Sequence, residues 1–144
     1  MARLFLWVIP ALLAIPATPA PARVLIGVVD ARFRLCSYAV HEQCVVDGDT
    51  FRLRGQRIRI ADIDAPEIRP SHCAREADLG SRATTRLLAL LNAGRFTLNP
   101  WPGRDTDRHG RLLRVVTRRG ESLGGMLVDE GLARPWGGRR ISWC

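Results

Sequence analysis

Ten residues near the middle of the chain alternate so regularly between apolar and basic side chains that they restrict the local fold to a β-hairpin. In "FRLRGQRIRI", residues 51–60, every second residue is apolar on each side of Gly55 and Gln56. Strict alternation is typical of a strand with one buried face, and a short break containing glycine is typical of a tight turn. Four apolar side chains are therefore expected to face the core: Phe51, Leu53, Ile58 and Ile60. The arginines between them are expected on the other side of the sheet or at its rim: Arg52, Arg54, Arg57 and Arg59.

Between Ala74 and Asn92 the apolar residues no longer alternate but recur at the spacing of a helix. The apolar residues at helical spacing define one stripe: Leu79, Ala83, Leu87, Leu90 and Leu91. Glu76 and Asp78 stand in the first turn, where carboxylates favour the helix dipole, and Gly94 follows the end. Three arginines are expected on the outer face of this helix: Arg75, Arg82 and Arg86.

The remaining elements are short. Strand composition occurs at residues 26–35, 44–46, 95–99 and 111–119, a loop is expected at 100–110, and a second, short helix at 122–133. Strands on either side of one long helix, in a chain of this size, favour a mainly β fold with helices, of the α+β class. We expect a five-stranded barrel on which two helices pack.

The first 22 residues are typical of an export signal. Arg3 precedes an apolar run from Leu4 to Ile15, and Ala20-Pro21-Ala22 offers a small-residue cleavage site. A retained membrane anchor is the alternative, but Pro10 and Pro16 interrupt a run that is short for a span. We expect a secreted or periplasmic monomer with no stable membrane association after processing. The expected organisation is a signal peptide at 1–22, a spacer with an extra strand at 23–43, and a barrel domain at 44–144.

The chain contains four cysteines, Cys36, Cys44, Cys73 and Cys144. In an exported protein the oxidising compartment favours disulfides, and the sequence lacks the closely spaced cysteine pair that zinc prefers. Three pairings are possible. We favour Cys36 with Cys44, which flank a short polar excursion, and this choice leaves Cys73 to pair with Cys144.

All 22 basic residues of the 144 are arginine, and the formal net charge is +8. Planar guanidinium groups are suited to bidentate contacts with phosphate, so a polyanionic partner is expected. A basic balance that only aids solubility is the alternative.

Carboxylates gather at both ends of the predicted hairpin. Asp47 and Asp49 bracket Gly48 before it, and Asp64 and Glu67 follow it, where Pro66 turns the chain. Adjacent strands can bring Asp49 and Asp64 to one end of a barrel, where unpaired carboxylates repel unless a cation lies between them. Oxygen ligands of this kind indicate a hard metal ion, calcium or magnesium. The alternative is that these acids form solvated ion pairs with the nearby arginines.

Three blocks in this order resemble the thermonuclease family, which comprises the staphylococcal-nuclease-like domains: "VVDGDTFRL", "IRIADIDAPE" and "DRHGRLLRVV". The similarity covers about residues 44 to 134. The resemblance implies an OB-type barrel and a calcium-dependent nuclease that hydrolyses phosphodiester bonds of DNA, RNA or both.

The resemblance also implies a role for each matching residue. Asp49 and Asp64 match the calcium-binding aspartates, and the main-chain carbonyl of Ala65 completes the protein ligands. Arg59 and Arg111 match the arginines that bind the scissile phosphate. Glu67 matches the carboxylate that activates the attacking water.

The chain departs from the family pattern at two places. Ala65 stands where the family often has threonine, so a carbonyl contact survives but a hydroxyl contact does not. The tyrosines that pack on the nucleotide are not evident, and Trp136 or Trp101 is the substitute, although tryptophan in a small protein is more often part of the core. A non-catalytic nucleic-acid-binding barrel and a structural or inhibitory secreted domain are the alternative functions.

Overall fold

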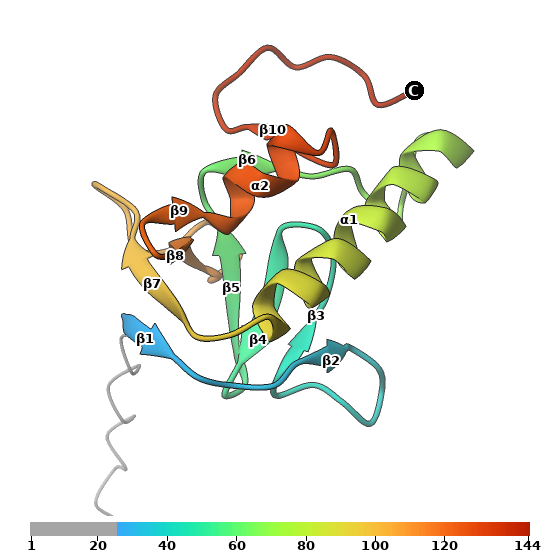
Figure 1. Cartoon of the computed structure of the whole chain (residues 1–144). Coiled ribbons are helices and arrows are strands. Elements are labelled where there is room, and N and C mark those ends of the chain that lie inside the picture. Colours follow the sequence, from blue (N-terminus) through green and yellow to red (C-terminus); the bar gives the residue numbers. More distant parts are fainter. Residues whose placement is uncertain (1–25) are drawn as a thin grey trace, which may run out of the picture.

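A curled β-sheet forms the framework of the protein (Figure 1). The computed structural model describes residues 26–144, so the expected signal peptide lies outside the described residues. Within that range the strands follow the order β1–β7–β8–β5–β4–β3–β2, with β9 beside β8, while β6 and β10 form a separate pair. Their bounds are β1 Gly27–Val29, β2 Arg34–Leu35, β3 Cys44–Val45, β4 Thr50–Leu53, β5 Gln56–Ile60, β6 Ile63–Asp64, β7 Phe96–Pro100, β8 Leu112–Arg118, β9 Glu121–Ser122 and β10 Arg134–Pro135.

Two helices, α1 (Ala74–Asn92) and α2 (Leu123–Asp129), pack on the sheet. The predicted α+β class is therefore confirmed. The sheet order has five central strands, β3, β4, β5, β8 and β7, with β1 at one edge and β2 at the other. The parallel pairing of β5 with β8 sets Ile58, Arg59 and Ile60, at the end of β5, beside Leu112, Leu113 and Arg114, at the start of β8.

The hairpin of β4 and β5 has the predicted face but a different turn. Leu53 pairs with Gln56, so the turn is Arg54-Gly55 and not Gly55-Gln56. Arg54 has φ 52° and Gly55 has φ 78°, and two positive values in sequence match the twist of a tight hairpin. Arginine rarely adopts such a φ, which is why its place in the turn was not predicted. The four apolar residues expected inside are all buried.

Residues 26–35 were expected to form one strand, and they form two. β1 pairs with β7 and β2 pairs with β3, so this segment links the two ends of the sheet order. Between the two strands Phe33 enters the core and contacts Phe51 and Phe96 at centroid distances of 5.7 and 6.0 Å. The side chain of Asn92, at the end of α1, bonds both the N–H and the carbonyl of Phe33. The division of the chain at residue 43 stays a prediction.

Helix α1 has the predicted bounds, and most of its predicted apolar stripe is buried. Cys73 is its N-cap, and its sulfur accepts a hydrogen bond from the Glu76 N–H. The last turn of α1 contains no basic residue, but Arg118 from β8 donates to the carbonyls of Leu90 and Gly94. A cation from another element therefore stabilises the negative end of the helix.

Both predicted disulfides are present, Cys36–Cys44 and Cys73–Cys144. The second connects the N-terminal end of α1 to the last residue of the sequence, across a separation of 71 residues, whereas the first spans 8. Among residues 26–144, no helix is both long and apolar enough to cross a bilayer.

We expect the two disulfides to contribute unequally to stability. Because the loop closed by Cys73–Cys144 is much longer, replacing that pair by serine should lower the free energy of unfolding by about 2 kcal/mol more than replacing Cys36 and Cys44. Urea unfolding of the two double variants measures the difference. Peptide mapping without reduction that found four free thiols would contradict both pairings.

Candidate active site

The guanidinium group of Arg59 occupies the centre of the site. Its Nη2 lies 3.2 Å from Asp49 Oδ2 and 3.6 Å from Asp64 Oδ1, and its Nη1 donates to the Ile63 carbonyl at 2.9 Å. The indole of Trp136 covers it, with 5.0 Å from Arg59 Cζ to the ring centroid. Arg59 was expected on the other side of the sheet or at its rim, but only 9% of its side chain is exposed because Trp136 and the carboxylates enclose it.

Asp49 is held by several groups in the turn between β3 and β4. Its Oδ2 accepts the N–H of Ala65, and its Oδ1 accepts the hydroxyl of Thr50. Its own N–H donates to Asp47 Oδ1. The sequence prediction that Asp49 and Asp64 meet at one end of the barrel is confirmed by their shared contact with Arg59.

Two glycines allow α1 to approach this cluster closely. A Cβ on Gly48 would lie 2.7 Å from the Cβ of Ala83 and 2.8 Å from that of Ala65. A Cβ on Gly80 would lie 2.7 Å from the carbonyl oxygen of Pro66. Both distances are too short for real side chains, so the segment from Ala65 to Glu67 lies directly against the helix.

Glu67 ends this segment and lines the same cavity as Asp49 and Asp64. The residue as a whole is exposed. Partial burial of its carboxyl, together with the negative charges of Asp49, Asp64 and Glu76, raises the pKa of Glu67, and Arg111 opposes the increase. A raised pKa makes a carboxylate a stronger base.

Glu76 was expected in the first turn of α1, but it is buried and holds the loop that carries Glu67. Its Oε2 accepts the His72 N–H at 2.6 Å and lies 2.8 Å from His72 Nδ1. These bonds and one from the N–H of Glu67 lower the pKa of Glu76. One buried carboxylate thus fixes both ends of the loop from Glu67 to His72.

Arg111 approaches the cluster from the loop before β8. Its Nε donates to Asp107 Oδ2 at 2.7 Å, and its Nη1 donates to the Thr50 hydroxyl at 3.2 Å. Thr50 in turn bonds to Asp49, so the two arginines expected to bind phosphate are joined through two residues. Burial alone would raise the pKa of Asp107, but hydrogen bonds from Arg111 and His109 lower it to about 2.

A second acid and arginine pair anchors the other part of this loop. Arg114, on β8, is fully buried, and its Nη1 lies 2.7 Å from Asp105 Oδ1. The Leu113 N–H donates to the Asp105 carbonyl at 2.8 Å. The loop at 100–110 is therefore tied down at Asp105 and at Asp107.

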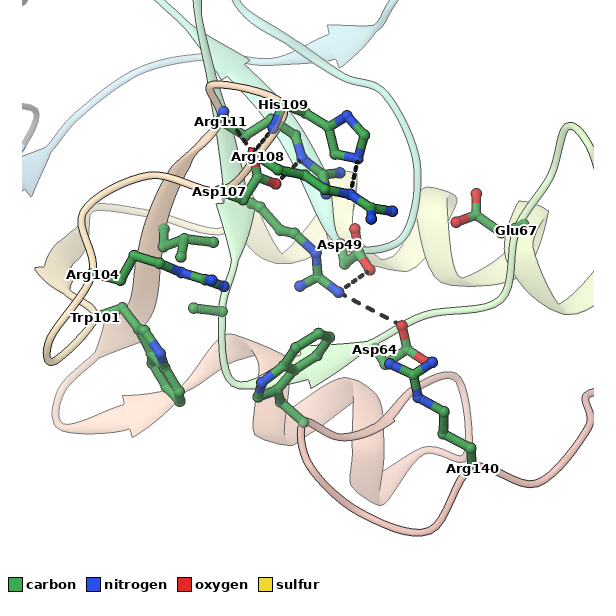
Figure 2. A pocket seen from close by; sticks show the side chains of 14 residues that line it. Asp49, Asp64, Glu67, Trp101, Arg104, Asp107, Arg108, His109, Arg111 and Arg140 are labelled. Atoms are coloured by element: carbon green, nitrogen blue, oxygen red, sulfur yellow. Dashed lines mark hydrogen bonds and ion pairs between the residues drawn. The ribbon is translucent and has the colours of Figure 1, made fainter.

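These groups surround one cavity of about 430 Å³ (Figure 2). Carboxylates line one part of it, and five arginines and two indoles line the rest: Arg59, Arg104, Arg108, Arg111, Arg140, Trp101 and Trp136. Ala61, Leu113 and His109 complete the lining. The cavity has the size of a small-ligand site and offers both charged and flat apolar surface.

The acids fit the donor chemistry of a hard cation. Within residues 26–144 no group of three or more His, Cys, Asp or Glu side chains is arranged to hold a metal. A site would therefore combine the Asp49 and Asp64 carboxylates with a main-chain carbonyl such as that of Ala65. Burial, and secondarily the charge of Asp49, raise the pKa of Asp47 to about 7.

The model of a family described as staphylococcal nuclease homologue matches residues 57–139, more than half of the chain. The chain belongs to the staphylococcal nuclease family. The resemblance seen in the three sequence blocks is thereby confirmed, and the curled sheet with two helices agrees with the barrel of that family.

Individual relatives within the curated proteins are longer than this chain. Endonuclease YncB of Bacillus subtilis (strain 168) is 34% identical over 94 residues, which cover 62% of this chain and 44% of that protein. SPbeta prophage-derived endonuclease YokF of the same strain is 36% identical over 94 residues, which cover 62% of this chain and 31% of that protein. Succinoglycan biosynthesis protein ExoI of Rhizobium meliloti (strain 1021) is 30% identical over 98 residues, which cover 65% of this chain and 50% of that protein. The chain thus matches half or less of the length of each.

All six site residues predicted from the family resemblance lie together in the structure. Asp49, Arg59, Asp64, Glu67 and Arg111 line the cavity, and Ala65 bonds to Asp49. Four supporting residues of the site were not predicted from the sequence: Glu76, Asp107, Arg134 and Arg140. Asp107 had a usable signal, since an acid four residues before Arg111 in a tight turn often bonds back to it. The others depend on tertiary packing.

Gly80→Ala should destabilise the protein although alanine favours a helix by about 1 kcal/mol over glycine. The added Cβ would meet the carbonyl of Pro66, so the Ala65 to Glu67 segment must move. The matched control is Gly125→Ala in α2, where the nearest atom would be Ser122 Cβ at 3.4 Å. Urea unfolding should show a loss for the first variant and no loss for the second, and equal effects would contradict the close approach.

Asp107→Asn should lower the free energy of unfolding by an amount that depends on pH. A carboxyl with its pKa lowered to about 2 stabilises the folded state above its unfolded pKa of about 4, and this contribution disappears as pH falls towards 2. We expect a difference of about 2 kcal/mol between parent and variant at pH 6. Urea unfolding from pH 7 to pH 2 measures it. A difference that does not shrink below pH 4 would mean that the hydrogen bonds do not favour the ionised form.

Proposed function

We propose that this chain is a secreted or periplasmic calcium-dependent nuclease that hydrolyses phosphodiester bonds of DNA, RNA or both. The observation that carries the proposal is the convergence of two arginines and three carboxylates on one cavity: Arg59, Arg111, Asp49, Asp64 and Glu67. Family membership and the names of the endonucleases YncB and YokF support the reaction class. The two disulfides support an oxidising location.

Glu67 is proposed as the general base. Water that attacks a phosphodiester must lose a proton, and a positioned carboxylate contributes about a hundredfold to ten-thousandfold in rate. Glu67 lines the cavity, and its raised pKa brings its basicity closer to that needed near neutral pH. Glu76 and Gly80 fix the segment that carries it.

Arg59 and Arg111 are proposed to bind the scissile phosphate. Guanidinium forks can donate two hydrogen bonds to a phosphate and stabilise the negative charge that grows on its oxygens. Asp107 and Thr50 orient Arg111, and Asp49 and Asp64 orient Arg59. Both arginine side chains are therefore already ordered before the substrate binds. Such preorganisation is what makes electrostatic stabilisation effective.

Asp49, Asp64 and the carbonyl of Ala65 are proposed to hold calcium. When bound, the ion would supply positive charge and polarise a phosphate oxygen. The buried Ala65 fits this role because its N–H already fixes Asp49, and a main-chain carbonyl does not require the threonine side chain.

Trp136 and Trp101 are proposed to contact nucleotide bases. Both indoles line the cavity, and Trp136 already stacks on Arg59. A base that stacks on an indole typically contributes about 1 to 3 kcal/mol without regard to sequence. This contact suits a nuclease that accepts either DNA or RNA.

The proposal is tested by measuring cleavage of fluorescently labelled DNA and RNA by the purified protein with calcium and with a chelator. We expect cleavage that a chelator abolishes. Glu67→Gln should lower kcat by at least about a hundredfold and change the affinity for nucleic acid little, because it removes the base but keeps the size.

Glu42→Gln is the matched control, since Glu42 is exposed and lies outside this cavity. It should cleave at the parent rate. Binding without cleavage by the parent protein would support the alternative, a non-catalytic nucleic-acid-binding barrel. Cleavage by Glu67→Gln at the parent rate would exclude Glu67 as the base.

A further inference from the structure

The last eight residues, 137–144, cross the surface beside the active site as a segment that we call the strap. The strap begins after β10, which pairs with β6 so that Arg134 lies opposite Asp64. Gly137, with φ 77°, permits the turn in which the Gly138 N–H donates to the Pro135 carbonyl. Figure 1 shows the red strap arching away from β10 and returning towards α1, where Cys144 is bonded to Cys73.

Arg134 fastens the strap to the site. Its Nη1 donates to the carbonyl of Ile141, and its Cζ lies 3.8 Å from the ring centroid of Trp143. On its other side its Nε lies 3.5 Å from Asp64 Oδ2. The position of the strap and the position of Asp64 therefore depend on the same side chain.

Arg140 is the strap residue that reaches the cavity. It lines the main cavity together with Asp64 and Trp136, and a smaller adjoining one of about 130 Å³. Figure 2 shows its guanidinium on the Asp64 side of the cavity, away from Arg104. Within residues 26–144, Arg140 has no hydrogen bond or ion pair. Arg59 and Arg134, by contrast, each form an ion pair with Asp64.

An arginine without a protein partner at the wall of a basic cavity is available for an oxyanion of the substrate. Asp64 does not require Arg140, because two other guanidinium groups already contact it. The phosphate under attack is assigned above to Arg59 and Arg111. Since a nucleic acid presents a phosphate at every nucleotide, Arg140 on the Asp64 side of the cavity fits a neighbouring phosphate.

We infer that the strap is a substrate-binding element in which Arg140 binds a phosphate next to the scissile one, and that the Cys73–Cys144 disulfide holds it in place. This inference rests on the nucleic-acid substrate proposed above. The ligand class is the sugar-phosphate backbone of a single strand, so the contact adds affinity without base specificity.

The test is direct binding of a fluorescent single-stranded oligonucleotide in a chelator, over a series of salt concentrations, with its integrity checked on a gel. Arg140→Ala should raise Kd several-fold and reduce the slope of log Kd against log salt by about 0.7, the value for one phosphate contact on a single strand. Arg139→Ala is the matched control. Arg139 is also an exposed arginine of the strap but does not line the cavity.

The tether is tested by replacing Cys73 and Cys144 together with serine, because serine at position 73 keeps a good N-cap for α1. This variant should bind more weakly than the parent, and adding Arg140→Ala to it should cause a smaller loss than Arg140→Ala causes in the parent, because the Arg134 contacts with the strap remain. Circular dichroism at the binding temperature confirms that each variant is folded.

Three outcomes would overturn the inference: unchanged binding by Arg140→Ala, equal losses from Arg139→Ala and Arg140→Ala, or additive losses from Arg140→Ala and the serine pair. These three outcomes concern binding, so they can be distinguished from an outcome that refutes the proposed nuclease reaction. A parent protein that binds the oligonucleotide through Arg140 but never cleaves it would refute the nuclease and leave the strap intact.

Discussion

The buried ion cluster around Arg59 is the interaction on which the site depends. One guanidinium group joins the turn before β4, the end of β5, the strand β6 and the indole after β10. Removing one member of a buried charge pair leaves the other uncompensated and typically costs about 3 to 5 kcal/mol. Because Arg59 links elements that are distant in sequence, its loss would separate the catalytic groups as well as remove one of them.

Local patterns in the sequence predicted the fold well where one face of an element is buried. Phe51 and Ile58 follow period two, and Leu87 and Leu91 follow the helical period, because burial on one side imposes that spacing. Patterns failed where tertiary contacts override them. Arg54 adopts a positive φ because the hairpin twist requires it, and residues 26–35 split because Phe33 turns into the core.

The candidate site was predicted from matching motifs, and its supporting residues were not. Glu76 looked like a dipole-favouring residue on a helix surface, but the loop from Glu67 to His72 folds over it. Arg114 lies in a predicted strand whose composition did not indicate that its side chain is fully buried against Asp105. The arginines of this chain therefore have different structural roles. Some anchor loops, one binds the carbonyls at the end of a helix, and others line the cavity.

The packing around Gly48 places a limit on how this site can vary among sequences. The absent Cβ of Gly48, the methyl of Ala65 and the methyl of Ala83 meet at one point between the acidic turn and α1. The space available to these three positions is shared, so a larger residue at one of them is tolerated only if the helix moves outward. Any such movement would carry Gly80 and Glu76 with it and shift Glu67. The volume at position 65 is thus set by helix packing, independently of any ligand that its carbonyl binds.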